Sequence, residues 1–347
     1  EKLFKLKEHG TDVKTEIIAG ITTFLAMAYI LAVNPSYLGG IDGMSAGAVF
    51  SATAISAGIA TLCMAFFANY PVALASGMGL NAFFAFTVCG AMGYSYKVAL
   101  TAVFKFREAL VNKIPSNLKF AITAGIGLFI AIIALLNANV VVASESTTVA
   151  LGELSSPTVV LSLVGLLIIG ALQHYKVPGG ILLGILITWV LGIMAQLVGW
   201  YVPNPEAGVY SVIPQFSLSS FEAPKMFQFD FGFIAKNIPA FILIVFTFLY
   251  TDIFDTVGTL IGVAEKGKLL DKDGSLPNAT GALMADAVGT VVGACLGTST
   301  VTSYVESSAG VAAGGRTGLT AVTTAVLFFI SLIFAPIFTS IPSFATT

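Results

Sequence analysis

Four acidic side chains lie inside strongly apolar stretches of this 347-residue chain, and they are the residues best placed to do chemistry: Asp252, Asp255, Asp286 and Glu306. A charge inside a membrane costs roughly 2.5–3.5 kcal/mol on insertion scales. No lysine or arginine lies in the middle of the same stretches to neutralise them. We therefore expect each carboxyl to be protonated, bound to a ligand or ion, or held by hydrogen bonds.

Two of these carboxyls share one helical face. Asp252 and Asp255 are three positions apart in the segment TDIFDTVGT, which places them side by side on a helix. The neighbouring threonines make the same face polar: Thr251, Thr256 and Thr259. This pattern favours a functional face, and the alternative is an aspartate that only caps a helix or ties helices together. Asp286 stands between alanines near the start of its helix, which is more typical of a structural role.

Glu306 lies in GTSTVTSYVESSAGVAAGG, a serine- and threonine-rich stretch without a long apolar run. Such a stretch is typical of a broken membrane crossing buried in protein, with an extended piece leading into a short helix whose N-terminus offers unpaired N–H groups. The segment NYPVALASGMGLNAFFAF is its counterpart, with Pro71 before an extended piece, Gly77 and Gly79 for close backbone approach, and Asn81 as donor and acceptor. A conventional span with packing glycines is the alternative for this segment.

The two broken crossings and the Asp252 face together predict one small polar site beside aromatic rings, among them Phe84. Carboxylates and an amide next to such rings suit a flat, neutral heterocycle and suit an inorganic anion poorly. A protonatable carboxylate in a low dielectric also meets a requirement for proton coupling. We assign substrate binding to Asn81, Asp252, Glu306, Phe83, Tyr304 and Thr300, and proton coupling or transport to Asp252, Asp255 and Glu306.

Composition excludes several classes of protein. Hydrophobic residues make up 56% of the chain and charged residues 10%, whereas soluble domains carry roughly 25% charged residues. The net charge of −2 provides no basic footprint for nucleic acid. The cysteines lie in apolar stretches without ligand spacing, so we expect neither a disulfide scaffold nor a metal site, and no cofactor: Cys63, Cys89 and Cys295.

Long apolar windows predict an all-helical membrane protein with many crossings. The windows are Ile17–Asn34, Gly47–Ala68, Leu118–Val142, Pro157–Gln173, Gly179–Trp200, Ile238–Val263, Gly281–Gly297 and Thr317–Pro342. The stretches Pro71–Cys89 and Thr298–Gly315 add two weaker crossings. With a cytosolic N-terminus, every basic residue lies inside except Lys97, Lys225 and Lys236, as the positive-inside rule requires.

Weak internal matches predict two inverted halves. GAVFSATA from Gly47 corresponds to GALMADAV from Gly281, and LTAV occurs at both Leu100 and Leu319. Seven crossings lie between the start of the first copy and the start of the second. Because this number is odd, the second copy has the opposite orientation in the membrane. The stretch from Leu100 to Pro115 is shorter than its counterpart, so we expect residues to be missing near Phe104 and Lys105, and the last three helices of the native chain to be absent.

Four motifs in order carry a family resemblance: GITTFLAMAYILAVNP from Gly20, ASGMGLNAFFAF from Ala75, TDIFDTVGTLIGV from Thr251 and GTSTVTSYVESSAGVAAGGRTGLTAV from Gly297. The chain resembles the AzgA-like purine permeases, the hypoxanthine/guanine/adenine branch of the nucleobase-ascorbate transporter superfamily. The resemblance implies fourteen segments in two inverted repeats of seven, with a core domain, a gate domain and short antiparallel strands in the broken crossings. It places substrate contacts on Asn81, Asp252 and Glu306, with Asp255 important for transport.

The expected domain boundaries follow from this frame. Residues 1–16 form a cytosolic segment, 17–119 the first half of the core, 120–200 the first half of the gate, 201–236 an extracellular loop, and 237–347 the second half of the core. The second half of the gate lies beyond the chain. The expected location is the plasma (inner) membrane, and the expected partners are a purine, a proton and the lipid bilayer, but not nucleic acid. A homodimer stays open.

The sequence therefore predicts a proton-coupled symporter that imports hypoxanthine, guanine or adenine by alternating access, and not an enzyme. A uracil or xanthine symporter of the same superfamily is the main alternative, because polar contacts alone do not define ring size. An anion transporter of the related sulfate-permease fold would need a neutral or basic site. A two-aspartate intramembrane protease would need its aspartates on two helices, whereas Asp252 and Asp255 lie on one.

Overall fold

The computed structural model describes residues 3–104, 125, 128, 131–144, 147–203, 211–213, 221–271 and 276–346. Within these ranges, seven helical segments are long and apolar enough to cross a membrane. They are Val13–Leu38, Ala46–Phe67, Pro157–His174, Gly180–Leu197, Ile238–Gly267, Ala279–Leu296 and Gly318–Thr339. Each overlaps a predicted window. Most of the predicted window Leu118–Val142 lies outside the described residues, as do Lys105 and Pro115, on which the expected shortening of one segment depends.

The spans are built from the following helices: α1 (Val13–Met27) and α2 (Ile30–Leu38), α3 (Ala46–Phe67), α7 (Pro157–His174), α8 (Gly180–Leu197), α10 (Ile238–Gly267), α11 (Ala279–Leu296) and α13 (Gly318–Ser331). Shorter helices complete the fold: α5 (Tyr96–Phe104), α9 (Gly232–Lys236), α14 (Ala335–Thr339) and α15 (Ser343–Thr346). Capping residues define two of the starts. Asp12 accepts a hydrogen bond from the Thr15 N–H at 2.9 Å, and Ser45 caps α3.

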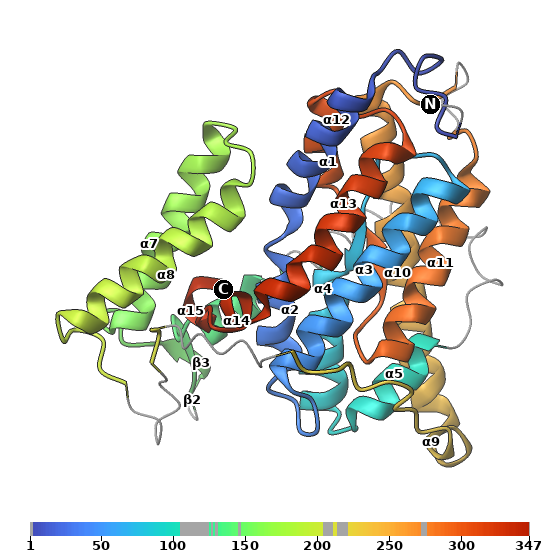
Figure 1. Ribbon diagram of the computed structural model, residues 1–347. Coiled ribbons are helices and arrows are strands. Elements are labelled where there is room, and N and C mark those ends of the chain that lie inside the picture. The colour runs from blue at the N-terminus through green and yellow to red at the C-terminus, as the bar shows by residue number, and fades with distance from the viewer. Residues whose placement is uncertain are drawn as a thin grey trace.

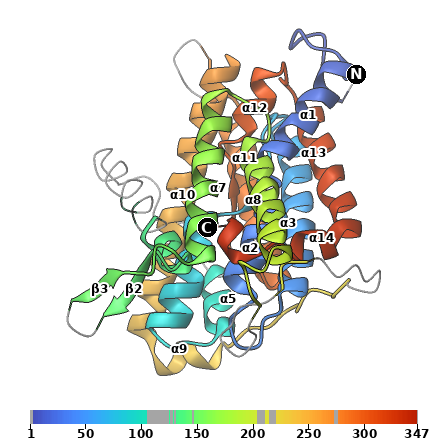
Figure 2. The same ribbon diagram turned by 90° about the vertical axis from the view of Figure 1, so that its left-hand side faces the viewer.

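Helices α1, α3, α10, α11 and α13 pack into one bundle, whereas α7 and α8 form a separate hairpin beside it (Figures 1 and 2). Small side chains allow the close approach inside the bundle. A Cβ atom placed on Gly289 of α11 would lie 2.6 Å from the Cβ of Ala60 on α3. Close packing through small residues is the usual way in which helices associate in a membrane. The assignment of these two groups to core and gate domains stays a prediction.

Both predicted broken crossings are confirmed, and they meet through their strands. Strand β1 (Leu74–Ser76) pairs antiparallel with β4 (Val301–Ser303). After β1 the chain enters α4 (Met78–Ala82) and continues as the π-helix η1 (Phe83–Ala91). After β4 it enters α12 (Ser307–Ala312). The first crossing is therefore broken rather than a conventional span.

The ends of the two strands are bonded in the same way. The Gly77 N–H donates to the Thr300 carbonyl at 3.0 Å, and the Tyr304 N–H donates to the Ala73 carbonyl at 3.0 Å. Each bond joins the residue directly after one strand to the residue directly before the other. This reciprocity is what two copies of one unit related by a twofold axis produce, in agreement with the inverted repeat.

A threonine behind each strand repeats the same relation. The Thr61 hydroxyl of α3 accepts from the Leu74 N–H at 3.0 Å and donates to the Leu74 carbonyl at 3.1 Å. The Thr290 hydroxyl of α11 bonds the N–H and carbonyl of Val301 at 3.3 and 3.1 Å. Each threonine thus satisfies backbone groups that the membrane interior could not.

The sequence did not predict a second pair of strands. Strands β2 (Val141–Ser144) and β3 (Thr148–Leu151) pair antiparallel, although the apolar window was expected to run as one helix to Val142. The described helical residues 131–137 end before these strands. The run of β-branched residues from Val140 favours a strand over a helix, and apolar composition alone does not separate the two.

The first helix also begins earlier than its window. Glu16 lies in the first turn of α1, fully buried, rather than at the end of a surface segment. Its carboxylate accepts hydrogen bonds from the Arg316 N–H at 2.8 Å, the Thr320 N–H at 3.1 Å and the Thr320 hydroxyl at 2.6 Å. Glu16 therefore caps the start of α13 from another helix and ties the two halves of the chain together.

Candidate binding site at the broken crossings

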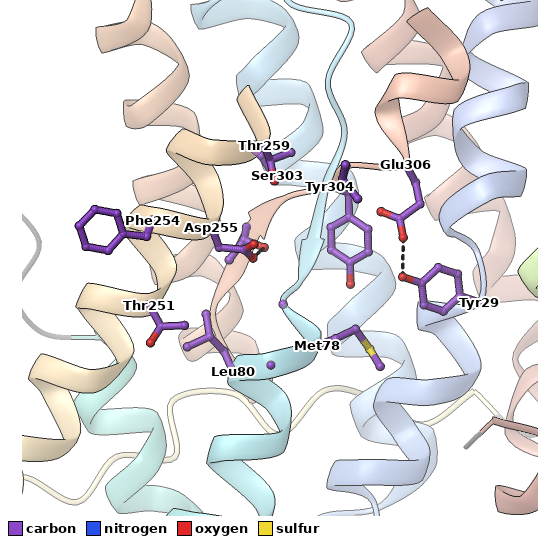
Figure 3. Close-up of a pocket in the computed structure, with 14 residues that line it drawn as sticks. Tyr29, Met78, Leu80, Thr251, Phe254, Asp255, Thr259, Ser303, Tyr304 and Glu306 are labelled. Atoms are coloured by element: carbon purple, nitrogen blue, oxygen red, sulfur yellow. Dashed lines mark hydrogen bonds between the residues drawn. The ribbon is translucent and has the colours of Figure 1, made fainter. Parts of the chain in front are cut away.

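A cavity of about 240 Å³ lies where the two broken crossings meet α10 and the first span (Figure 3). The residues that line it are Tyr29, residues 77–80, Thr251, Phe254, Asp255, Thr259 and residues 302–306. The broken crossings and the first span present their residues there because each changes direction at this level, whereas α10 passes the cavity as one continuous helix. The strands end, the short helices begin, and the first span is interrupted between α1 and α2.

Glu306 provides one acidic wall. It is the residue directly before α12, and its side chain makes no capping bond to that helix. The Tyr29 hydroxyl donates to Glu306 Oε1 at 2.7 Å. Figure 3 shows the two side chains meeting at one edge of the cavity. The Glu306 carboxylate is therefore held by a side chain from the first span rather than by its own helix.

Asp255 provides the facing wall from α10. The Thr302 hydroxyl donates to Asp255 Oδ2 at 3.1 Å. In Figure 3, Asp255 and Glu306 point toward the space around Tyr304 from opposite sides. The Tyr304 hydroxyl in turn donates to the Ser76 carbonyl, which directs the ring along the strand pair. Two hydrogen-bond acceptors thus face each other across one aromatic ring.

The other crossing contributes backbone N–H groups and the apolar side chains of Met78 and Leu80, which Figure 3 shows beside the cavity. Residues Met78–Ala91 form one continuous helix, and Gly77 before it has no side chain that could cap it. The N–H of Asn81 makes the first bond back to the Gly77 carbonyl, at 2.8 Å. The N–H groups of residues 78–80 therefore have no acceptor within the helix, and these residues line the cavity. They make this edge a donor edge.

Three of the residues that the sequence pointed to line the cavity: Asp255, Tyr304 and Glu306. Thr251 and Thr259 of the predicted polar face line it too, as do Gly77 and Gly79. The structure thus brings together residues from three distant segments, as expected. Their roles in binding or proton coupling stay predictions.

Asn81 and Thr300 lie behind the cavity wall. Asn81 is fully buried, and among the described residues neither its Oδ1 nor its Nδ2 has a hydrogen-bond partner. Thr300 offers its carbonyl to the Gly77 N–H, while its side chain is buried. Direct contact between a cavity ligand and either side chain requires the wall to move.

Asp252 and Phe83 also lie outside the lining residues. Asp252 is 1% exposed, turned into the bundle, although it shares a helix face with Asp255. Phe83 packs edge-on against Phe248, with ring centroids 5.1 Å apart. The cavity is therefore lined by Asp255, which was predicted to act in transport, and not by Asp252, which was predicted to contact the substrate.

Asp286 occupies the position expected of a structural residue. The Thr256 hydroxyl of α10 donates to Asp286 Oδ1 at 2.6 Å, and the Ser303 N–H approaches the same hydroxyl oxygen at 3.5 Å. The three residues join α11, α10 and β4. Among the described residues no group of three or more histidine, cysteine or acidic side chains could hold a metal ion.

Sequence reasoning missed Tyr29 and Thr302, the two residues whose hydroxyls donate to the cavity carboxylates. Tyr29 precedes Glu306 by 277 positions, and it sits in an apolar run without a polar neighbour. Thr302 was one of several similar residues in TSTVTS, of which Thr300 was chosen. Strand alternation could not have separated the two, because residues two positions apart face the same side. For Tyr29 no local signal exists.

Solved structures with the same architecture define the class. The transmembrane domain of the cyanobacterial bicarbonate transporter BicA superposes with a TM-score of 0.69 at 14% identity, covering 96% of this chain and 86% of that one. SLC26A9 superposes with a TM-score of 0.65 at 11% identity, covering 99% and 57%. At such identities the likeness concerns the fold alone. The chain has the inverted-repeat fold of multi-pass membrane transporters.

Sequence comparison then defines the family. Residues 14–347 match the family model Xan_ur_permease, described as "Permease family". The chain belongs to this family, and it is a transporter rather than an enzyme. The adenine permease AdeQ of Escherichia coli is 43% identical, covering 99% of this chain and 77% of the relative, and a putative permease of Methanocaldococcus jannaschii is 46% identical, covering 100% and 79%. The guanine/hypoxanthine permease PbuO of Bacillus subtilis is 44% identical, covering 84% and 68%.

Proposed function

We propose that the protein is a proton-coupled symporter that imports purine nucleobases, namely hypoxanthine, guanine and adenine, across the plasma membrane. The observation that carries the proposal is the cavity in which two carboxylates, Asp255 and Glu306, face each other and the backbone N–H groups of residues 78–80 form a further edge. Relatives named as adenine and guanine/hypoxanthine permeases support the substrate class.

A purine matches this distribution of donors and acceptors. Its ring N–H groups would donate to Glu306 and its unprotonated ring nitrogens would accept from the N–H groups of residues 78–80. The Tyr304 ring would lie against the flat heterocycle. Ligand pockets for drug-sized molecules start at about 300 Å³, so a cavity of about 240 Å³ suits a smaller ligand such as a single nucleobase.

A carboxylate at the site is also the group through which protons would be coupled. Among the described residues no lysine, arginine or histidine lines the cavity, so the two facing carboxylates would repel each other, and a proton on one of them would lower the cost of loading the site. Asp255 and Glu306 are therefore our candidates for the coupling groups, with Asp252 behind them. We place the N-terminus in the cytosol, because that orientation satisfies the distribution of basic residues.

Transport would follow from relative motion of the two helix groups. The bundle that carries both broken crossings would act as the core domain, and α7 with α8 would belong to the gate domain. In inverted-repeat transporters one such group moves against the other around a site near the membrane midplane. The site would then open to each side of the membrane in turn.

A xanthine or uracil symporter is the second candidate. The family model carries these substrates in its name, and a putative xanthine/uracil permease of Schizosaccharomyces pombe is 33% identical, covering 97% of this chain and 63% of that one. An anion substrate fits less well, because Asp255 and Glu306 would repel it.

Uptake of radiolabelled hypoxanthine by proteoliposomes that hold the full-length protein tests the proposal. We expect uptake driven by an inward proton gradient, abolished by a protonophore, and blocked by unlabelled guanine or adenine. A sodium gradient of equal size serves as the matched control for coupling. Block by uracil or xanthine alone would favour the second candidate. No uptake with either gradient would overturn the proposed function.

A further inference from the structure

We propose that Tyr29 is a positioning residue for Glu306: its hydroxyl holds Oε1 of the carboxylate, so that Oε2 is the oxygen presented to the cavity. The hydroxyl lies 2.7 Å from Oε1, within the range of a strong, charge-assisted hydrogen bond. Tyr29 itself lines the cavity. The proposal rests on the proposed function in so far as it makes Glu306 a substrate contact.

The backbone around Tyr29 explains how the hydroxyl is held in place. Tyr29 lies between α1 and α2, where the N–H groups of Leu31 and Ala32 bond three residues back, at 3.1 and 3.0 Å. Pro35, one turn further on, has no N–H for the Leu31 carbonyl, and its ring crowds that carbonyl. The span therefore tightens at this level and turns the Tyr29 side chain toward the second crossing.

Packing on both sides then restricts the ring. Tyr29 contacts the apolar cluster inside the bundle, which contains Phe50 and Phe328, and also the cluster formed with α8, which contains Trp189. A ring held between two packed groups has few rotamers, so the hydroxyl is a preorganised donor. Without this donor, the Glu306 side chain would lose its rotamer freedom when the substrate binds, and that loss would weaken binding.

The consequence concerns a single oxygen atom. With Oε1 engaged, Oε2 accepts a ring N–H of the substrate when Glu306 is ionised. When Glu306 is protonated, the Tyr29 hydroxyl donates to the carbonyl oxygen Oε1, so the proton resides on Oε2. Tyr29 thus leaves the same atom, Oε2, for the substrate N–H and for a proton, so in a symport step that uses ionised Glu306 as the substrate contact the coupling proton would reside on Asp255.

The variant Tyr29→Phe removes only the hydroxyl and keeps the packed ring. We expect the KM for hypoxanthine to rise about tenfold, with kcat within about twofold, because a ground-state contact is weakened. In a Glu306→Gln background the same substitution should change binding much less, since the effects of substitutions at two interacting residues are not additive. The matched control is Tyr37→Phe, which removes the hydroxyl of a buried tyrosine of α2 that packs against Phe86. An equal effect of Tyr29→Phe in both backgrounds would overturn the proposal.

An infrared measurement on the ligand-free protein does not depend on the substrate. The C=O stretch of protonated Glu306 is isolated as the difference between wild type and Glu306→Gln at acidic pH. Loss of the Tyr29 hydroxyl should move this band to higher wavenumber, whereas Tyr37→Phe should not. An unchanged band would overturn the proposal even if purines are transported. A shifted band without purine uptake would retain the positioning role of Tyr29 and reject only the proposed function.

Discussion

The two broken crossings share one backbone and differ in what they bring to the cavity. Counted from their strands, Gly77 and Gly79 of the first crossing occupy the positions of Tyr304 and Glu306 of the second. The first supplies space and backbone N–H groups, and the second supplies a phenol and a carboxylate. The repeat therefore conserves hydrogen bonding of the main chain, while the chemistry of the site arises from its asymmetry.

A symmetric pair would bind a nucleobase less well. Glutamates from both crossings would add a second like charge close to the first, and glycines in both would leave no acidic acceptor on either strand end. With one of each, the cavity has a donor edge and an acceptor edge. A purine, which carries both kinds of group on one ring system, can use the two edges together.

The largest effect should come from removing the acceptor edge. Glu306→Gln preserves the shape of the side chain and removes its charge, so we expect a loss of hypoxanthine affinity on the order of 100-fold, because hydrogen bonds to charged groups contribute about 1.5–3 kcal/mol. Equilibrium binding to the purified protein measures it. Glu153→Gln, in an exposed loop, is the matched control. Unchanged affinity in Glu306→Gln would remove this residue from the site.

A smaller loss of hypoxanthine affinity should follow when Gly77 of the first crossing is given a side chain. A Cβ atom at Gly77 would lie 3.1 Å from Cγ2 of Thr302, whose hydroxyl bonds Asp255. Gly77→Ala should therefore shift Thr302 and weaken binding about tenfold, the equivalent of about 1.4 kcal/mol. Gly170→Ala, where a Cβ meets nothing within 4 Å, should leave binding unchanged. Wild-type affinity in Gly77→Ala would show that the space at this glycine is not needed.

Substitution of the two threonines behind the strands tests whether the backbone of each crossing is stabilised to the same extent. Thr61→Val and Thr290→Val each leave a buried N–H and carbonyl without their side-chain partner, at a cost of about 1–3 kcal/mol. Thermal unfolding in detergent should show a similar drop in Tm for both. Thr22→Val, whose hydroxyl bonds only the Ile18 carbonyl of its own helix, serves as control. A drop in one variant alone would mean that the two halves are not equivalent in energy.

The smallest predicted effect is on the stability contributed by Asp12, whose carboxylate caps its own helix, α1. The hydrogen bond from the Thr15 N–H lowers the pKa of Asp12 below its ordinary value. Its contribution to stability is therefore complete above the unfolded pKa of about 4 and is lost as the pH falls through the lower, folded pKa. In Asp12→Asn this acid-dependent part of the Tm between pH 5 and pH 3 should disappear. An identical pH dependence in both proteins would contradict it.

Local pattern was sufficient for the elements and for part of the site. The spans follow from runs of apolar residues, and both broken crossings follow from glycine, proline and hydroxyl residues where lipid would demand a helix. Glu306 and Asp255 were predicted because charged groups in an apolar chain are costly and therefore informative, and Tyr304 was predicted as an aromatic ring beside them. An apolar run is compatible with a helix or a strand, and for this reason the helix predicted as far as Val142 was wrong where the strands β2 and β3 form.

Helical spacing could not separate Asp252 from Asp255. Three positions turn a helix by 300°, so the two side chains diverge by about 60°, and the neighbouring elements decide which of them meets open space. In the folded chain Thr302 of β4 lies against Asp255, while the bundle encloses Asp252.

Hydrophobicity and backbone propensity act over a few residues, and the chain alone therefore specifies its spans, its two breaks and the presence of buried acids. Which oxygen faces the cavity depends on contacts between residues hundreds of positions apart, such as Tyr29 with Glu306 and Glu16 with Thr320. These contacts arise only when the two inverted halves dock. Packing of whole segments, rather than any local preference, sets the distances between them.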